Sequence, residues 1–138
     1  SLEFLSRESN LNSLVFLDLK YNKIDTINKD SFKNLQNLER LSFCSNQVEE
    51  IQPCSFKNMP KLVYLSMSQN KLKNINSNSF RELHNLESLF LYNNSIENIE
   101  EGAFNDLKKL RMLYLSNNNL KYLDSKIFKH LVSLTDLS

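Results

Sequence analysis

The chain has 138 residues, with 17 basic and 16 acidic side chains and a formal net charge of +1. A length of this size permits one domain, and the near balance of charge argues against a surface that binds nucleic acid or anionic membrane unspecifically. One glycine and two prolines leave no linker between domains. We therefore expect a single folded unit over residues 1–138.

The sequence repeats with a period of 24 residues. Asparagines recur at this interval without insertion or deletion, at Asn22, Asn46, Asn70, Asn94 and Asn118. Seven apolar columns keep the same register, as in the repeat that contains Leu38, Leu41, Phe43, Val48, Ile51, Phe56 and Met59. Self-similarity at a fixed period of about 20–50 residues predicts a repeat architecture.

The period divides the chain into repeats and two ends. The five repeats are 14–37, 38–61, 62–85, 86–109 and 110–133, and a partial sixth strand follows at 134–138. Residues 1–13 do not keep the register, so we expect an irregular segment or a partial preceding repeat there. A lone repeat should be unfolded, because only stacking buries its apolar face.

Each repeat opens with L-x-x-L-x-L, whose alternation predicts one short, half-buried strand. In repeat 86–109, Leu89 and Leu91 fall on one side of that strand, and Ser88, Phe90 and Tyr92 fall on the other. Identical strands joined by return paths of fixed length can pair only in parallel. We therefore predict a solenoid with one continuous parallel sheet.

The asparagine column after each strand should form a ladder. An Asn amide has two donors and an acceptor, enough to hold peptide groups that leave the sheet at the bend and to bond to a neighbouring coil. Farther on, I-x-x-I covers the turn of the coil. F-x-x-L, as in Phe104 and Leu107, indicates a short helical turn on the outer side. Small or polar residues before each Phe, such as Ser31 and Ser55, are candidate caps for that turn.

These columns resemble the typical leucine-rich repeat, L-x-x-L-x-L-x-x-N-x-L-x-x-I-x-x-x-x-F-x-x-L-x-x, over residues 11–138. The resemblance implies an α/β fold: a right-handed horseshoe solenoid with a parallel β-sheet on the concave face and short helical turns or loops on the convex face. A repeat of this length with Phe in the outer column is similar to extracellular members, among them Toll and Toll-like receptor ectodomains and Slit-like proteins. Those members usually carry cysteine-rich terminal caps. None is present here, so we expect a segment of a longer secreted or membrane-anchored parent.

The resemblance also implies recognition of a protein or microbial ligand rather than catalysis. The leading hypothesis is a segment of an extracellular or cell-surface receptor of the Toll-like innate-immune type. A secreted or cell-surface adhesion or scaffold protein is the alternative, and an intracellular interaction scaffold is the third reading. The resemblance is compatible with a homo- or heterodimer of the parent. We expect no nucleic-acid partner and no membrane span in this segment.

Candidate ligand-binding residues should lie where the repeats differ, on the outward strand positions. Because neighbouring strands lie about 4.8 Å apart, the large side chains of three coils should form one concave patch of Tyr64, Phe90, Tyr92, Met112 and Tyr114. Aromatic residues beside small serines are typical of a binding hot spot. They are also good strand formers that pair across strands without any ligand.

A secondary candidate site is the polar group Asp18, Lys20 and Arg40. Opposite charges on adjacent strands are more often a solvated pair worth roughly 0–1 kcal/mol than a recognition site. We therefore favour the aromatic patch over this group as the place where a ligand binds.

Two cysteines and one glycosylation acceptor complete the candidates. Cys44 should point outward from the sheet and Cys54 lies on the outer side, so a bridge between them would cross the coil and exceed the roughly 7 Å limit on Cα separation. Either both are unpaired, or Cys54 pairs with a cysteine outside this segment. Asn93, in Asn93-Asn94-Ser95, is an N-glycosylation acceptor if the parent is secreted, and we expect it to be exposed.

Catalytic, metal and cofactor sites are not expected. His84 and His130 fall on outer turns nearly two repeats apart and cannot share a metal ion. No Ser, His and acidic group converge on one face, and a single glycine leaves no loop to hold a phosphate. The sequence therefore predicts a protein that is not an enzyme.

Overall fold

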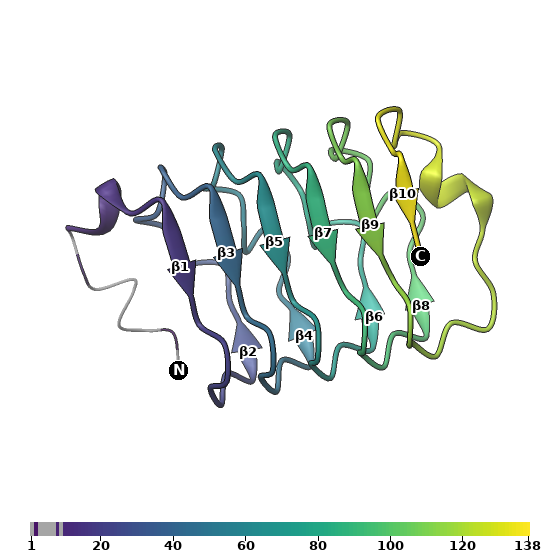
Figure 1. Cartoon of the computed structure of the whole chain (residues 1–138), viewed down its shortest axis with the longest axis horizontal. Coiled ribbons are helices and arrows are strands. Elements are labelled where there is room, and N and C mark those ends of the chain that lie inside the picture. The colour runs from purple at the N-terminus through teal and green to yellow at the C-terminus, as the bar shows by residue number, and fades with distance from the viewer. Residues whose placement is uncertain (1, 3–7, 9) are drawn as a thin grey trace.

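The computed structural model describes residues 2, 8 and 10–138. The chain winds into coils, and each coil adds one strand to a six-stranded parallel sheet (Figure 1). In order, these strands are β1 (Phe16–Asp18), β3 (Arg40–Ser42), β5 (Tyr64–Ser66), β7 (Ser88–Phe90), β9 (Met112–Tyr114) and β10 (Asp136–Leu137). The register pairs Leu41 with Leu65 and Leu65 with Leu89, one period apart. The predicted horseshoe solenoid with a parallel sheet is confirmed.

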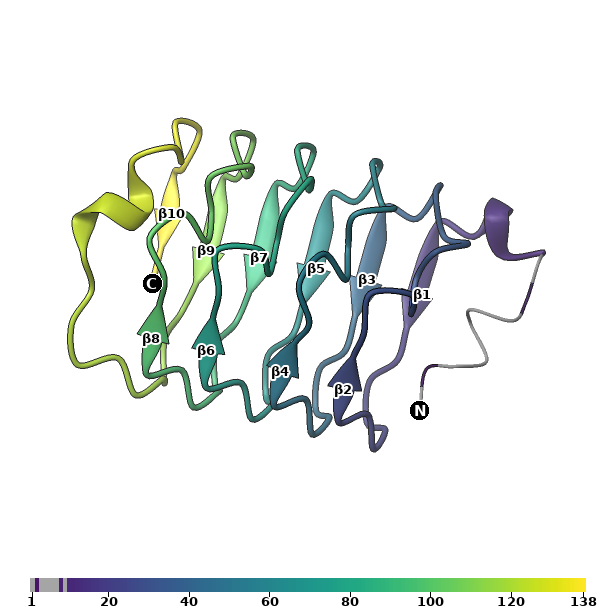
Figure 2. The ribbon, with the colours of Figure 1, turned by 180° about the vertical axis from the view of Figure 1, so that it is seen from behind.

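A second short strand follows in four coils, where the sequence predicted only a turn. β2 (Thr26–Ile27) pairs with β4 (Glu50–Ile51), and β6 (Asn74–Ile75) pairs with β8 (Asn98–Ile99), both in parallel. These strands are seen most directly from behind (Figure 2). Each ends in an isoleucine of the I-x-x-I column, which packs toward the core and keeps successive backbones in pairing distance. The prediction of one strand per repeat was therefore incomplete.

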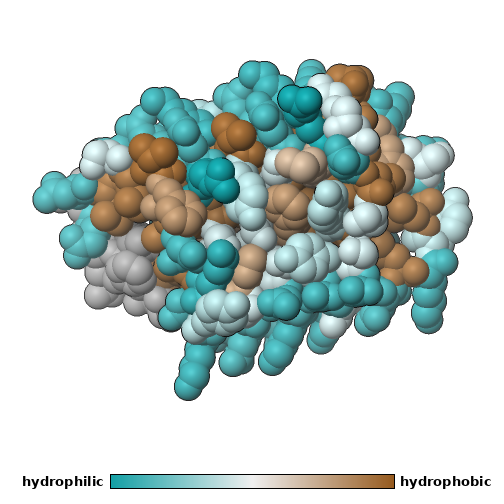
Figure 3. All heavy atoms as spheres, in the orientation of Figure 1, coloured by the Kyte–Doolittle hydropathy of each residue, from teal (hydrophilic) through white to brown (hydrophobic). Residues whose placement is uncertain are grey.

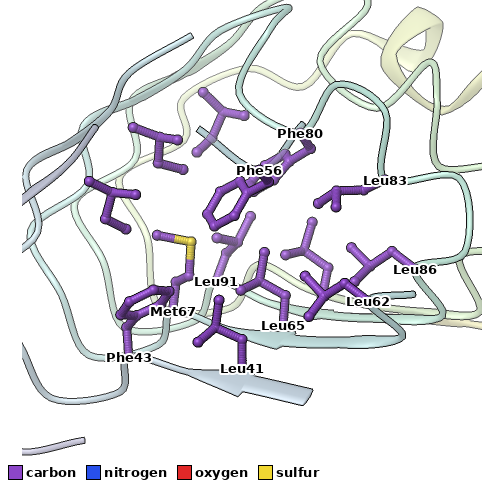
Figure 4. Close-up of a cluster of buried hydrophobic side chains, with 14 of the residues drawn as sticks. Leu41, Phe43, Phe56, Leu62, Leu65, Met67, Phe80, Leu83, Leu86 and Leu91 are labelled. Carbon is purple, nitrogen blue, oxygen red and sulfur yellow. The ribbon is translucent and has the colours of Figure 1, made fainter. Parts of the chain in front are cut away.

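The core lies between the main sheet and the outer turns, and each repeat contributes buried apolar side chains to it. Figure 4 shows part of this core, where Leu41 and Leu65 of the strands lie beside Phe56 and Phe80 of the outer turns. Strand leucines such as Leu41 and Leu65 are fully buried. On the outer side, four phenylalanines form a stack, with ring centroids 5.7, 6.2 and 6.1 Å apart along Phe32, Phe56, Phe80 and Phe104. The Phe stack ties four coils together on the convex side, as the sheet does on the concave side.

The outer segments of the first four coils are turns rather than helices. Met59 N donates to Phe56 O at 3.1 Å, and this closes F-x-x-L as a single turn. Ser55 Oγ donates to Gln52 O at 2.7 Å and to Ile27 O of the preceding coil at 3.1 Å. The described residues contain two 3₁₀ helices, η1 (Leu11–Ser13) and η2 (Ser125–Phe128). No helix among the described residues is long and apolar enough to cross a membrane.

The asparagine ladder joins each coil to the one before it. Asn70 Nδ2 donates to Phe43 O of the preceding coil at 3.0 Å and to Met67 O of its own coil at 3.1 Å. Its Oδ1 accepts from Val48 N at 2.9 Å. The same pattern recurs at Asn46, Asn94 and Asn118. Asn22, in the first coil, donates to carbonyls of its own coil.

The residue before each ladder asparagine has a left-handed backbone. The φ angles are 56°, 56°, 57°, 54° and 56° at Tyr21, Ser45, Gln69, Asn93 and Asn117. This conformation costs roughly 1–2 kcal/mol in a residue other than glycine. The sharp bend there is what directs the next side chain into the coil. Side chains at the bends also pair: Ser45 Oγ donates to Gln69 Oε1 at 2.5 Å, and Asn117 Nδ2 donates to Asn93 Oδ1 at 2.8 Å.

The expectation for residues 1–13 falls partly outside the described residues, because 1, 3–7 and 9 are not among them. Leu2 is buried in the core. Asn37 Nδ2 donates to Asn12 O at 2.6 Å, and the equivalent Asn85 Nδ2 donates to Pro60 O at 2.7 Å. The described part of the N-terminal segment thus meets the first full coil through the same contact that later coils use.

Candidate functional site

A groove of about 730 Å³ lies on the exposed face of the main sheet, toward the ends at which the chain leaves the strands. We call it the concave groove. Its lining residues are Lys20, Tyr21, Cys44, Tyr64, Ser66, Ser68, Gln69, Phe90, Tyr92, Tyr114, Ser116 and Ser138. Figure 3 shows this face, where weakly polar and apolar residues cross the middle of the sheet and hydrophilic side chains gather along the lower edge.

Three rings from successive strands form an aromatic wall. The centroids of Tyr64 and Phe90 are 5.2 Å apart with the rings tilted at 44°, and those of Phe90 and Tyr114 are 5.1 Å apart at 87°. The sheet register explains the contacts, because Phe90 lies directly opposite Tyr114 and Tyr64 lies diagonally across from Phe90. Edge-to-face and tilted geometries are the favoured arrangements for aromatic pairs. The wall therefore presents a fixed apolar surface.

Cysteine and serine side chains form the floor of the groove. Cys44 Sγ lies 2.9 Å from Ser66 Oγ and 3.1 Å from Ser68 Oγ, and Ser42 Oγ donates to Cys44 Sγ at 3.4 Å. The three serines are buried although they face away from the core. Hydroxyl groups between bulky walls thus give the groove a polar base.

The thiol of Cys44 is more acidic than an ordinary cysteine. Burial raises its pKa, but hydrogen bonds from Ser42, Ser66 and Ser68 and the positive charge of Lys20 together outweigh burial, so the net pKa lies below its usual value. The hydroxyls stabilise the thiolate by donating to it, which is the third of the common causes of a shifted pKa. Cys44 should therefore react as a thiolate at a lower pH than a free cysteine.

One residue of the secondary candidate group, Lys20, lines the groove, and Arg40 contacts a residue of its wall. Lys20 lines the groove, and its Nζ lies 3.6 Å from Asp18 Oδ2. The guanidinium of Arg40 lies over the ring of Tyr64, with its carbon 4.7 Å from the ring centroid. The ion pair therefore forms within the first coil, and Arg40 covers one face of the aromatic wall at Tyr64.

The structure brings four of the five predicted patch residues to the groove and leaves one outside. Met112 lies in a separate hollow of about 200 Å³ with Arg111 and Asp136. Its neighbour on β7 is Ser88, whose side chain is too small to connect Met112 to the aromatic wall. The sequence reasoning missed Tyr21 and Gln69, which reach the groove from the bends. Their recurrence one residue before the ladder asparagines was the signal that could have identified them.

Asn93 is less exposed than predicted, and the two cysteines do not form a bridge with each other. Asn93 is half-buried rather than exposed, because its Oδ1 accepts from Asn117 and its N donates to Ser116 O at 3.0 Å. Both cysteines are free thiols, so no bridge links Cys44 to Cys54. Within the described residues, no three His, Cys, Asp or Glu side chains gather as metal ligands would.

Comparisons with known proteins agree with this architecture. Residues 4–136 match the family model described as BspA type leucine rich repeat region, in six copies. Epiphycan of chicken (Gallus gallus) is 40% identical over 42 residues, which are 30% of this chain and 13% of epiphycan. The crystal structure of a TLR13–ssRNA13 complex matches with a TM-score of 0.90 and 33% identity, over 94% of this chain and 18% of that chain.

The chain spans less than a fifth of the length of either relative. The family model, by contrast, covers nearly all of the chain, and its repeats run through the coils that build the sheet, the ladder and the groove. The chain belongs to the BspA type leucine-rich repeat family.

Proposed function

We propose that this chain is a recognition segment of a leucine-rich repeat receptor and that its concave groove binds a protein. The observation that carries the proposal is the aromatic wall beside the serine floor. Tyrosine provides a large, rigid contact surface with a polar tip, and serine provides adaptable hydrogen bonding. Within the described residues, the hydroxyls of Tyr64, Tyr92 and Tyr114 have no hydrogen-bond partner. All three are available to a bound protein.

We further infer that the parent is an extracellular or cell-surface receptor of the Toll-like innate-immune type. The likeness to the TLR13 structure at 33% identity supports this inference, as do the repeat length and the outer phenylalanine column. The alternative, a secreted or cell-surface adhesion or scaffold protein, has the same repeats and groove. What separates the two is the part of the parent outside this chain, and an intracellular scaffold is the third candidate.

The partner class follows from the charge of the groove. The TLR13 structure is of a complex with ssRNA13. Binding to nucleic acid gains much of its affinity by neutralising phosphates with Lys and Arg. The concave groove is lined by a single cation, Lys20, which already contacts Asp18. We therefore favour a protein over a nucleic acid as the partner of this chain.

Substitution of the groove residues tests the proposed function. The variant with Tyr64, Phe90, Tyr92 and Tyr114 changed to Ala should lose more than about 2 kcal/mol of binding free energy toward the partner. Purified extracellular proteins from the tissue that expresses the parent would be assayed by surface plasmon resonance. Tyr122→Ala is the matched control, because this tyrosine is 78% exposed and lies outside the groove.

Circular dichroism melting curves would establish that the quadruple variant keeps its fold. Equal affinity of that variant and the unchanged protein would overturn the groove as the binding site and move the ligand to the edges or the outer turns. For the location, the parent would be recovered from its native source and treated with N-glycosidase. A glycan on Asn93, absent from an Asn93→Gln variant, would exclude the intracellular reading.

A further inference from the structure

We propose that the concave groove receives an extended, acidic segment of its protein partner. A carboxylate of this segment would lie against Arg40, which borders the groove where it covers Tyr64, and a large apolar side chain would lie against Phe90 and Tyr114. The proposal rests on the proposed function, since it takes a protein in the groove as given. It adds the chemistry of the bound segment and the way it lies across the strands.

The position of the carboxylate follows from the contacts and the exposure of Arg40. Its guanidinium is stacked on Tyr64 at 4.7 Å and is exposed to solvent. Among the described residues, no carboxylate pairs with it. A guanidinium held on an aromatic face keeps its N–H donors at its edge, where they match the two oxygens of a carboxylate. Arg40 is thus positioned for an acidic group that the chain itself does not supply.

The group Asp18, Lys20 and Arg40 carries one positive charge without a partner. Lys20 and Arg40 supply two cations, and Asp18 supplies one anion, at 3.6 Å from the Lys20 ammonium. Asp18 is also held by its own coil, because its Oδ1 accepts from Lys20 N at 3.0 Å. One further carboxylate would balance the group. A basic segment would meet repulsion at the same place, and such repulsion sets specificity.

The opposite end of the groove has a different character. Beyond β5, its lining residues are Phe90, Tyr92, Tyr114, Ser116 and Ser138, and none is charged. The edge-on contact of Phe90 and Tyr114, at 5.1 Å, leaves ring surface facing the groove. Aliphatic and aromatic side chains bury area on such a surface, and the serine hydroxyls can bond to peptide groups beside them.

The distance between the two contacts sets their spacing along the bound segment. From β3, which carries Arg40, to β7 and β9, which carry Phe90 and Tyr114, the sheet has two to three strand intervals, or about 10–14 Å at roughly 4.8 Å each. An extended peptide advances about 3.3 Å per residue, so it needs about three or four residues to cover that distance. We expect an acidic residue and a large apolar residue about three or four positions apart in the segment that binds.

A phage-displayed library of random nonapeptides, selected on the 138-residue chain, tests the proposal. Enriched peptides should carry Asp or Glu about three or four positions from a large apolar residue, in either direction. The double variant Lys20→Glu/Arg40→Glu should bind them at least about tenfold more weakly and should select basic peptides instead. Lys33→Glu/Lys57→Glu carries the same change in net charge on the outer turns and should keep the original preference.

The outcomes separate this proposal from the proposed function. Peptides that lose binding to Phe90→Ala/Tyr114→Ala but show no acidic preference would overturn the acidic segment and leave groove recognition standing. Enrichment that no groove substitution affects, or no enrichment at all, would overturn both. Single-stranded poly(U) RNA bound through Lys20 and Arg40 more tightly than any selected peptide would replace the acidic segment with a nucleic acid.

Discussion

At the scale of single residues, the ladder asparagines carry the most hydrogen bonds per side chain. Each central asparagine holds backbone groups of two coils in a place that water does not reach. Asn70 is 9% exposed and bonds to Phe43, Met67 and Val48. Removing such a side chain leaves several buried peptide groups without partners, and each costs roughly 1–3 kcal/mol. The ladder should therefore respond sharply to substitution.

We expect Asn70→Ala and Asn70→Asp each to lower the free energy of unfolding by about 2–4 kcal/mol. Aspartate has nearly the same shape, but its carboxylate cannot donate to Phe43 O or Met67 O. Urea denaturation followed by circular dichroism gives the measurement. Asn22→Ala is the control and should cost under about 1 kcal/mol, because Asn22 is exposed and bonds within its own coil. Similar losses at both positions would contradict a ladder between coils.

The acidity of Cys44 gives a prediction with a definite sign. Its lowered pKa means that the folded chain holds the thiolate at a lower pH than the unfolded chain. Stability from this group is therefore fully present above the unfolded value, about 8.5, and is lost as pH falls through the lower folded value. Iodoacetamide alkylation of the Cys44 peptide, followed by mass spectrometry, should show a midpoint below that of the urea-unfolded chain.

Ser66→Ala provides the internal test of that explanation. It removes a hydroxyl 2.9 Å from the thiol, and the alkylation midpoint of Cys44 should rise toward the unfolded value. The midpoint is the quantity to compare, because partial burial slows alkylation at every pH. A midpoint in the folded chain equal to that in urea would refute the hydrogen-bonded thiolate.

What the sequence could predict at this scale depends on whether the residue belongs to a column. The ladder asparagines and the strand leucines recur at one interval, so their burial follows from the pattern alone. Asn93 and Met112 do not behave as their positions indicated. Asn93 meets Asn117 through a bend whose left-handed backbone has no glycine to mark it, and Met112 lacks a bulky neighbour. Both outcomes depend on a second residue one coil away.

At the scale of elements, the outer turns are held by packing more than by their own backbone. The Phe stack gives these short segments a common apolar face. Phe80 lies between Phe56 and Phe104, at 6.2 and 6.1 Å, and is fully buried. Phe128, the equivalent residue of the last full coil, is half-buried and lies at the end of a 3₁₀ helix instead of in a turn.

Phe80→Ala should lower the free energy of unfolding by roughly 3–5 kcal/mol, because it opens a cavity and removes two ring contacts. Phe128→Ala should cost only about 1–2 kcal/mol, since less apolar area leaves the core. Urea titrations of the two variants, run together, measure the difference. Equal losses would contradict a stabilising role for the central position of Phe80 in the stack.

The sequence pattern predicts the strands of the main sheet but not the second, shorter strand of four coils. L-x-L gives enough alternation to place the main strands, whereas β2, β4, β6 and β8 have two residues each and show no alternation. They exist because the isoleucines of neighbouring coils hold the backbones in register. The F-x-x-L spacing did predict an outer turn. It could not distinguish a single turn from a helix, because both place residues three apart on one side.

At the scale of the whole molecule, the groove is formed by several coils together, and no single coil contains it. Each coil contributes between one and four residues to its lining. The sequence predicted the row of aromatic residues, but the contact of Arg40 with Tyr64 and the floor around Cys44 depend on how side chains pack between strands. The repeat fixes the spacing of the strands, and side-chain packing then determines the chemistry of the site.

A repeat array should open from its ends. We expect hydrogen exchange, followed by mass spectrometry, to show the strongest amide protection in β5 and β7 and at least about tenfold faster exchange in β10. β10 pairs on one side only, and Leu137 is 51% exposed. Asn70→Ala should speed exchange in the coils beside it more than in β10. Uniform protection along the chain would instead indicate a single cooperative unit.

The ladder has one more consequence, which concerns the length of the molecule. Asn94 Nδ2 reaches Met67 O just as Asn70 Nδ2 reaches Phe43 O, because both pairs are 27 residues apart. If residues 62–85 were excised, Asn94 would meet Phe43 O in the same geometry, and Phe104 would stack on Phe56. The ladder contacts are the same in each central coil. The central coils are therefore interchangeable in the ladder and the Phe stack, and the side chains that face the groove distinguish them.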